Sequence, residues 1–267
     1  MSYITEAINK WGKCRTGAIT MYGAGVGVYG NSGYAYTGST PSKLKKRIEE
    51  ANSSNAEITD INITENGNYV IILGGSGYWT LGYPDAFLKK LEQYRTGDLR
   101  DDNILSACFN DRGEWVVITD KHYSYSNETI KNFILKAEEL YEEVYYAYIT
   151  NYGMIACCKN GVYYKNIPSN LAEALKKLTF KPKVIKFTDN GLYLITDGES
   201  QNYYFRFSSV RLNRLRNKLL ANYLKSGGNE LATVRISAFC VAMLSNNSFI
   251  CKYSIFFRKY ELSAAVL

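Results

Sequence analysis

Residues Ile61–Leu91, "INITENGNYVIILGGSGYWTLGYPDAFLKKL", contain the pattern that decides the fold. Apolar and polar residues first alternate, and an Asn66-Gly67 turn then leads into an apolar run. A glycine-rich turn follows and leads into an aromatic run. Period-two alternation around Asn-Gly is typical of an antiparallel hairpin. After Pro84, apolar residues recur at helical spacing, and proline suits the start of a helix. The stretch therefore predicts three strands followed by one amphipathic helix.

The same pattern recurs along the chain. Tyr78 lies 44 residues after Tyr34, and Tyr123 lies 45 residues after Tyr78. Self-similarity at this period is typical of propellers, solenoids and arrays. Further copies occupy 19–48, 105–134, 147–175 and 184–215, and a degenerate sixth, 234–257, keeps the strand pattern but lacks the first turn.

The repeats predict a mainly β fold with helices (α+β), a six-repeat closed β-propeller-like ring. Each unit is expected to be a three-stranded antiparallel sheet plus one helix. Residues 3–12 resemble a repeat helix without a hairpin, and the sixth hairpin has no clear helix after it. If this helix completes the sixth unit, the ring closes and exposed sheet edges disappear. An open α/β solenoid with capping ends is the alternative.

The whole chain, 1–267, is predicted to form a single repeat domain. The expected repeat boundaries are approximately 13–56, 57–101, 102–143, 144–182, 183–229 and 230–267, the last completed by helix 3–12.

Three segments, "EWVVIT", "HYSYSN" and "NGVYYKNIPSNL", carry a family resemblance. Together they resemble tandem repeats of uncharacterised bacterial proteins, in which a W-V-V strand precedes a G-Y-x-Y-x-x-I-P-x-x-L segment. The resemblance covers residues about 16–205. It implies hairpin-plus-helix repeats in a propeller-like fold, and it implies no activity.

Composition excludes several classes of protein. At 267 residues, with 46% apolar and 21% charged residues, the chain fits a folded domain with a sizeable core. Its six cysteines follow no regular spacing and form no CxxC pair, which argues against a disulfide scaffold or a zinc site. No signal peptide and no apolar run of ~18 residues is visible, so we predict a cytoplasmic protein without a membrane span. No metal and no cofactor is expected.

The sequence offers little for catalysis. His122 is the only histidine and falls in a turn, where a lone histidine is more often incidental. Gly23–Gly30, "GAGVGVYG", resembles a nucleotide-binding glycine loop but lacks the strand–loop–helix context and the GK[ST] ending. Aspartates near the hairpin turns are explained by local capping of backbone N–H groups. No catalytic residue is assigned, and we predict that the protein is not an enzyme.

The aromatic third strands supply the ligand-binding candidates. Two aromatic columns, two residues apart, face the same way and are expected to pack against a helix or a neighbouring unit. The position between them faces the other side and varies from unit to unit. This variation favours contact with a ligand, and burial between units is the alternative for each residue. The candidates are Trp79, Tyr163 and Tyr204.

Charge gives a second hypothesis. The net charge is +7, and Arg211, Arg214 and Lys218 fall on one face of a predicted basic helix, 208–224. Such a stripe can neutralise phosphates, and a solvated helix face is the simpler interpretation.

We therefore predict a non-enzymatic binding or scaffold module, in one form lectin-like, whose partner is a protein or a glycan ligand. The alternative is a nucleic-acid-associated protein that uses helix 208–224. A hydrolase on a propeller scaffold is a third hypothesis, without a visible acidic pair or metal cluster.

Overall fold

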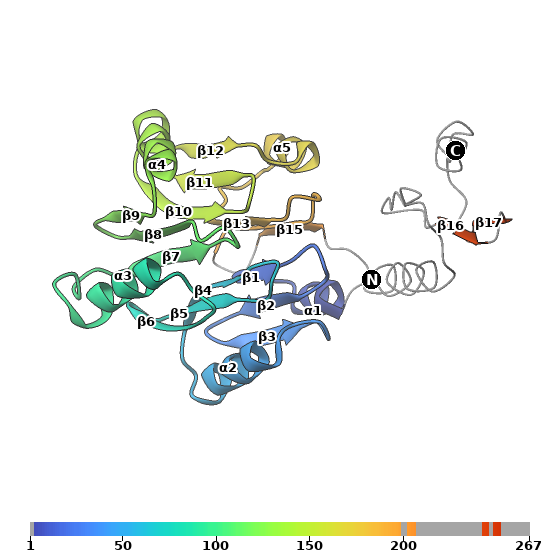
Figure 1. Ribbon diagram of the computed structural model, residues 1–267, viewed down its shortest axis with the longest axis horizontal. Helices are drawn as coiled ribbons and strands as arrows, with labels where there is room; N and C mark the ends of the chain where they lie inside the picture. The colour runs from blue at the N-terminus through green and yellow to red at the C-terminus, as the bar shows by residue number, and fades with distance from the viewer. Residues whose placement is uncertain (1–2, 199–201, 207–241, 246–247, 252–267) are drawn as a thin grey trace. The chain divides into compact units, whose positions relative to one another are not determined.

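The computed structural model describes residues 3–198, 202–206, 242–245 and 248–251 (Figure 1). The chain divides into two compact units, Met1–Phe207 and Ser208–Leu267. In the second unit the described residues form one antiparallel strand pair, β16 (Ala242–Ser245) and β17 (Ser248–Cys251).

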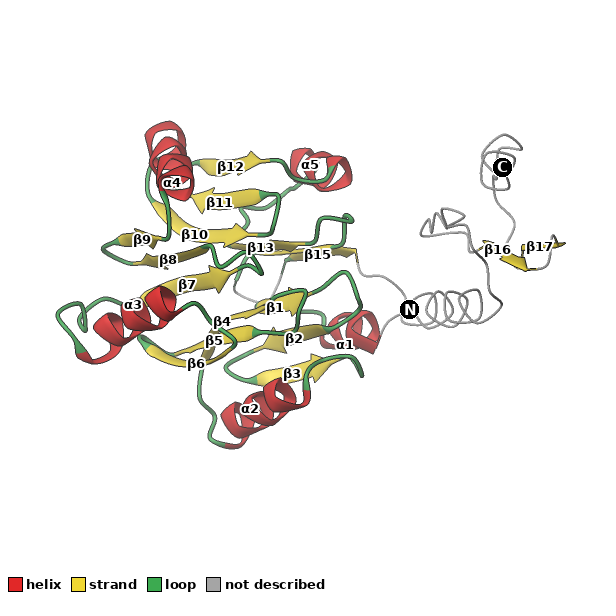
Figure 2. Cartoon of the chain, in the orientation of Figure 1, coloured by secondary structure: helices red, strands yellow, loops and turns green. Residues whose placement is uncertain are grey.

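Five three-stranded antiparallel sheets make up the described part of the first unit (Figure 2). In each sheet the strands follow one another in chain order, as in a β-meander. The sheets are β1 (Thr16–Ile19), β2 (Gly25–Tyr29) and β3 (Gly33–Tyr36); β4 (Ile58–Ile63), β5 (Tyr69–Leu73) and β6 (Gly77–Leu81); β7 (Ile104–Phe109), β8 (Trp115–Thr119) and β9 (Tyr123–Tyr125); β10 (Val144–Ile149), β11 (Met154–Cys158) and β12 (Gly161–Lys165); and β13 (Val184–Phe187), β14 (Tyr193–Thr196) and β15 (Tyr203–Arg206).

The turn between β4 and β5 shows why the sequence folds in this way. Gly67 adopts a φ of 83°, in the left-handed region that glycine enters without a steric penalty. Its N–H donates to the Thr64 carbonyl at 3.0 Å, and Thr64 N–H donates to the Asn68 carbonyl at 2.8 Å. The predicted Asn-Gly hairpin turn is therefore confirmed.

A helix follows each of the first four sheets: α2 (Ser42–Ser53), α3 (Asp85–Thr96), α4 (Glu128–Tyr141) and α5 (Ser169–Lys176). Pro41, Pro84 and Pro168 occupy the N-cap positions, one residue before the helical segments. Asn127 caps α4, because its side chain accepts the Ile130 N–H at 3.0 Å. Each of the first four predicted repeat ranges thus contains one sheet and its helix.

The sheets are arranged around a common centre. Their first strands contact one another in the order β1, β4, β7, β10, β13, and β13 contacts β1. The helices lie at the periphery (Figure 2). No hydrogen-bonded ladder joins one sheet to the next among the described strands, so the sheets remain separate.

Each helix fills the gap between two successive sheets. Leu44 and Ile48 of α2 belong to one buried cluster with Val28 of the first sheet and Ile61 of the second. The same holds for α3 between the second and third sheets and for α4 and α5 in the later gaps. Because helices cover both faces of the sheets, the middle strands are apolar on both faces, as predicted.

The N-terminal helix α1 (Tyr3–Trp11) fills the remaining gap. Ile4 and Ile8 pack with Cys14 and with Leu194 of β14, and α1 also contacts β2 and β3. The apolar face of α1 is therefore taken up by the first and fifth sheets. This corrects the predicted number of units for the described part of the chain, which holds five sheet-plus-helix units in place of six. Of the sixth copy, the structure describes the β16–β17 pair.

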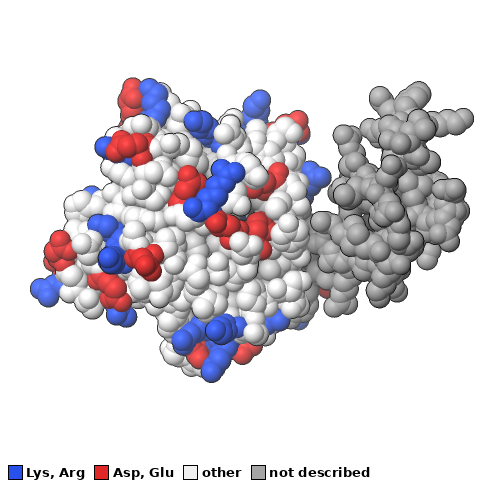
Figure 3. Space-filling view, in the orientation of Figure 1, with Lys and Arg blue, Asp and Glu red and all other residues white. Residues whose placement is uncertain are grey.

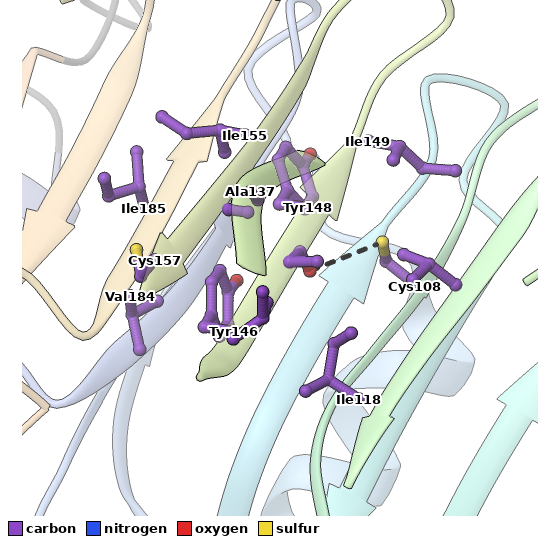
Figure 4. Packing of buried hydrophobic residues seen from close by; sticks show 14 of the residues in the cluster. Cys108, Ile118, Ala137, Tyr146, Tyr148, Ile149, Ile155, Cys157, Val184 and Ile185 are labelled. Atoms are coloured by element: carbon purple, nitrogen blue, oxygen red, sulfur yellow. Dashed lines mark hydrogen bonds between the residues drawn. The ribbon is translucent and has the colours of Figure 1, made fainter. Parts of the chain in front are cut away.

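The apolar middle strands supply much of the core. Trp115 is 6% exposed, and Val117, Ile72, Leu194 and Ile155 are buried. The largest cluster surrounds β10, where Tyr146, Tyr148, Cys157 and Ile155 converge (Figure 4). The described cysteines, Cys14, Cys108, Cys157 and Cys158, are buried and free.

A buried ion pair joins distant strands near the centre. Lys186 of β13 donates from Nζ to Asp60 Oδ1 of β4 at 2.7 Å and to Asn62 Oδ1 at 2.5 Å. The ammonium also lies about 5 Å from two tyrosine rings, 5.1 Å from Tyr146 and 5.0 Å from Tyr148. Burial lowers the pKa of Lys186, and the Asp60 carboxylate opposes this shift. The pair therefore links the fifth unit to the second across the centre.

Candidate ligand-binding cleft

An open cavity of about 390 Å³ lies between helix α2 and strands β5 and β6 of the second sheet. Its walls combine basic side chains of the helix with aromatic, hydroxyl and aliphatic side chains of the strands. The lining residues are Lys43, Lys46, Arg47, Glu50, Tyr69, Trp79, Thr80 and Leu81. We refer to this cavity as the α2–β6 cleft.

Helical and strand periodicity together place these side chains. The buried stripe of α2 consists of Leu44, Ile48 and Ala51, which leaves the neighbouring basic positions outside the core. On β6, Trp79 packs against the cluster that contains α2, whereas Tyr78 packs against the cluster that contains α3. Neighbouring residues of the strand thus face different helices, as the alternation predicts.

Arg47 and Trp79 form the centre of the cleft. The Arg47 guanidinium lies over the Trp79 indole, 5.2 Å from its centroid. Glu50 accepts a hydrogen bond from Arg47 at 2.7 Å, and this contact is the largest cause that raises the pKa of Arg47. Burial raises the pKa of Tyr69 as well, so its hydroxyl stays protonated at neutral pH. Arg47 is therefore a fixed cation held between a carboxylate and an indole.

Lys43 and Lys46 add two further positive charges at the same cleft. Both are exposed, and neither forms an ion pair with another described residue. Figure 3 shows basic side chains gathered over α2. Three cations against the single carboxylate of Glu50 leave a net charge of +2 around the cleft. The Thr80 hydroxyl is already engaged, because it donates to the Tyr69 carbonyl at 2.8 Å. The cleft can thus bind an anion beside an aromatic surface.

The other two predicted ligand residues lie elsewhere. Tyr163 of β12 packs against Phe133 of α4, with ring centroids 5.0 Å apart, so it belongs to a packed interface. Tyr204 of β15 is 50% exposed. The candidates lie on the second, fourth and fifth sheets, and no described contact brings the three together.

The two aromatic columns pack on helices, as predicted. Three of their tyrosines donate hydroxyl hydrogen bonds to glutamates on the following helix: Tyr36 to Glu49 at 2.7 Å, Tyr123 to Glu138 at 3.0 Å, and Tyr78 to Glu92. A tyrosine–glutamate contact of this kind thus recurs in three of the five described units.

The predicted basic stripe, Arg211, Arg214 and Lys218, lies outside the described residues. Its role in nucleic-acid binding stays a prediction.

His122 has a partner that the sequence did not reveal. Its Nδ1 lies 2.6 Å from Oδ2 of Asp102, a buried carboxylate that also accepts from the Thr119 hydroxyl at 3.2 Å. The imidazole itself is 56% exposed. The two residues are separated by a loop and a hairpin, so no local spacing could have indicated the pair. No described hydroxyl or thiol is hydrogen-bonded to the second ring nitrogen.

Two of the buried cysteines are unreactive, and the described residues form no metal cluster. Burial raises the pKa of the Cys14 and Cys108 thiols to about 12, so neither is a thiolate at neutral pH. Among the described side chains, no group of three or more His, Cys, Asp and Glu is arranged to hold a metal ion. None of the described helices has the length and apolarity needed to cross a bilayer.

No protein-family model, curated protein or solved structure matches this chain. The resemblance to tandem bacterial repeats therefore stays a prediction.

Proposed function

We propose that this protein is a non-enzymatic binding module that holds an anionic ligand in the α2–β6 cleft. The five units supply the scaffold, which we propose is a closed, propeller-like ring. Two observations support closure: β13 contacts β1, and α1 fills the gap between the fifth and first sheets. In such a ring, a helix carries the cleft on the periphery, away from the packed centre.

The proposal rests on the environment of Trp79. Trp79 lines a cavity beside two lysines without ion pairs. Surface lysines commonly decorate helices without binding anything. Here they converge with an arginine and an indole on one concave surface, a combination that recognises anions with an apolar or planar part.

The ligand class follows from the charge of the cleft. Both predicted partner classes, proteins and glycans, include anionic members, such as acidic peptides and acidic sugars. The net charge of +2 favours these over neutral peptides and neutral sugars. A lectin-like site for neutral sugars needs an open aromatic face, and the half-exposed Tyr204 is the better candidate for that version.

The test compares Trp79→Ser with the wild-type chain against three anionic probes: a heparin oligosaccharide, a polyglutamate peptide and a 5′-phosphorylated single-stranded DNA. We expect at least one probe to bind the wild type saturably and to lose most of its affinity in the variant. Tyr152→Ser is the matched control, because Tyr152 is 66% exposed and does not line the cleft.

Thermal unfolding of each variant separates lost binding from lost folding. Equal binding of all probes by Trp79→Ser and the wild type would reject the site. Turnover of a substrate by the purified protein would reject the non-enzymatic assignment. Binding of DNA that survives Trp79→Ser but falls steeply with salt would instead favour the nucleic-acid alternative.

A further inference from the structure

We infer that the α2–β6 cleft recognises a nucleotide, with the base stacked beside the Arg47–Trp79 pair and the phosphate bound by Lys43 and Lys46. The inference rests on the proposed function and names the ligand class of the same site.

The cation–π pair of Arg47 and Trp79 favours a planar ligand. A saturated sugar ring binds an indole through the exposed aromatic face, but Arg47 lies over the Trp79 ring at 5.2 Å. The side chain of Arg47 is 45% exposed, so part of the guanidinium faces solvent. Guanidinium planes stack on nucleobases, and an arginine already held by an indole and a carboxylate loses little freedom when a base is added. The pair therefore extends naturally into a stack of indole, guanidinium and base.

The charge favours a phosphate monoester. The cleft carries a net charge of +2, and a phosphate monoester carries about −1.5 to −2 at pH 7. A carboxylate of an acidic sugar or peptide carries only one negative charge. Lys43 and Lys46 lie three residues apart on α2, one turn of the helix, so both ammonium groups can reach one phosphate.

The size of the cavity limits the ligand to one monomer. Its volume of about 390 Å³ falls at the small end of the range for ligand pockets, roughly 300–1,000 Å³. The cleft is also open on one side, so a nucleotide at the end of a longer chain fits as well as a free one. A base and its phosphate then occupy the aromatic and the basic walls together.

The experiment is calorimetric titration of the full chain at low salt with four probes: adenosine 5′-monophosphate, adenosine, inorganic phosphate and glucuronic acid. We expect the monophosphate to bind at least about tenfold more tightly than each of the other three, because only it engages both walls. Comparable affinities for the monophosphate and for inorganic phosphate would overturn the stacking role of Arg47 and Trp79.

Charge-matched variants locate the phosphate. Lys43→Ala/Lys46→Ala should weaken binding of the monophosphate by about tenfold or more, and it should leave adenosine unchanged. Lys89→Ala/Lys176→Ala is the control, because it removes two exposed lysines from α3 and α5, outside the cleft. Equal effects of the two double variants would show a general charge effect and overturn the site.

Arg47→Phe tests the base. The substitution places at Arg47 the residue type found opposite Tyr163, so the fold should tolerate it. We expect loss of monophosphate binding without a loss of thermal stability. Binding of glucuronic acid that is lost in Lys43→Ala/Lys46→Ala, without binding of the monophosphate, would overturn the nucleotide and leave the proposed binding function standing. Absence of binding by all four probes overturns the nucleotide, and the Trp79→Ser panel then decides whether the cleft binds anything.

Discussion

In the second and the fourth unit, an aromatic residue of the third strand faces the preceding helix, but the helix residue opposite it differs. In the second unit, Arg47 of α2 faces Trp79 of β6 beside an open cavity. In the fourth unit, Phe133 of α4 faces Tyr163 of β12; Phe133 belongs to the largest buried cluster, and the partly buried Tyr163 packs against it. Each aromatic residue is the central residue of a third strand and faces the helix before its sheet. The strand position is thus the same in both units. The helix residue opposite it determines whether the contact is sealed inside the core or borders an open cavity.

The equivalence of the two helix residues can be counted along the sequence. Arg47 follows the buried Leu44 by three residues, and Phe133 follows the buried Ile130 by three. Phenylalanine at this position adds to the core, whereas arginine keeps its charged end in solvent and leaves the indole partly uncovered. One different helix residue in an otherwise repeated unit is therefore sufficient to create a cleft in one unit and not in another.

The largest expected effect concerns the buried contact of the fourth unit, between Phe133 and Tyr163. Phe133 is 5% exposed, so Phe133→Ala removes a core side chain and leaves a cavity. We expect a loss of about 3–5 kcal/mol in the free energy of unfolding, measured by urea denaturation. A loss below about 1 kcal/mol would mean that the fourth unit is as open as the second, and the comparison would fail.

Trp79→Ala should cost less, about 1–2 kcal/mol in the same measurement. The indole is only partly buried and borders the cavity, so fewer core contacts disappear. The decisive quantity is the difference between the two variants. Equal losses for Trp79→Ala and Phe133→Ala would assign Trp79 to the core and remove it from the proposed site.

Much of this comparison could have been made from the sequence, but one step was missing. Alternation identified Trp79 and Tyr163 as equivalent residues, and it placed both away from the aromatic columns. It gave no means to choose between them, because the choice depends on a helix about thirty residues earlier in the chain. The residue three positions after the first buried helix residue, Arg47 or Phe133, is the signal that separates the two.

The fold was predictable where local patterns determine it. Hairpin turns, aromatic strands and helices all appear in four successive repeat ranges, and three of the four helices follow a proline. The number of units was not predictable, because it depends on which sheets α1 packs between, and helix periodicity does not identify the partner of a helix. The repeat pattern therefore predicts the packing of the internal units better than the packing of the chain's ends.

Two polar contacts escaped sequence analysis for a physical reason. Lys186 alternates with apolar residues in β13 and resembles a solvent-facing residue, yet it is fully buried against Asp60. Its partner lies in another unit, across the centre of the molecule. Asp102 and His122 likewise meet only because a hairpin folds back. Long-range pairing of charges has no signature in a single sequence.

A third prediction concerns pH, which must be fixed when the two variants are compared. Burial, with smaller contributions from Asp111 and Asp189, raises the pKa of Glu65 from 4.5 to about 7. The folded state therefore binds this proton more tightly than the unfolded state. The resulting stability is full below about pH 4.5 and is lost as the pH rises through about 7.

Glu65→Gln removes this titration while the amide oxygen can still accept the Met21 N–H, which lies 2.8 Å from the carboxylate. We expect the wild type to lose about 1 kcal/mol more than the variant between pH 4.5 and 8, a value reduced by solvent screening of the partly buried group. Urea denaturation at four pH values measures it, with the exposed Glu173→Gln as the control. Parallel pH profiles for Glu65→Gln and the wild type would contradict the assignment.

The smallest expected effect is the coupling energy between Arg47 and Trp79. A double-mutant cycle on Arg47→Ala and Trp79→Ala should give about 0.5–1 kcal/mol, the usual strength of an exposed cation–π contact. The corresponding cycle on Phe133→Ala and Tyr163→Ala should give about 0.5–1.5 kcal/mol for an aromatic pair. The dependence on salt concentration distinguishes the two couplings even where their energies overlap. Raising the salt concentration should weaken the first coupling, because its cation is solvent-accessible, and leave the second unchanged. A salt-independent coupling between Arg47 and Trp79 would mean that the arginine packs through its aliphatic stem, and the second unit would then be sealed in the same way as the fourth.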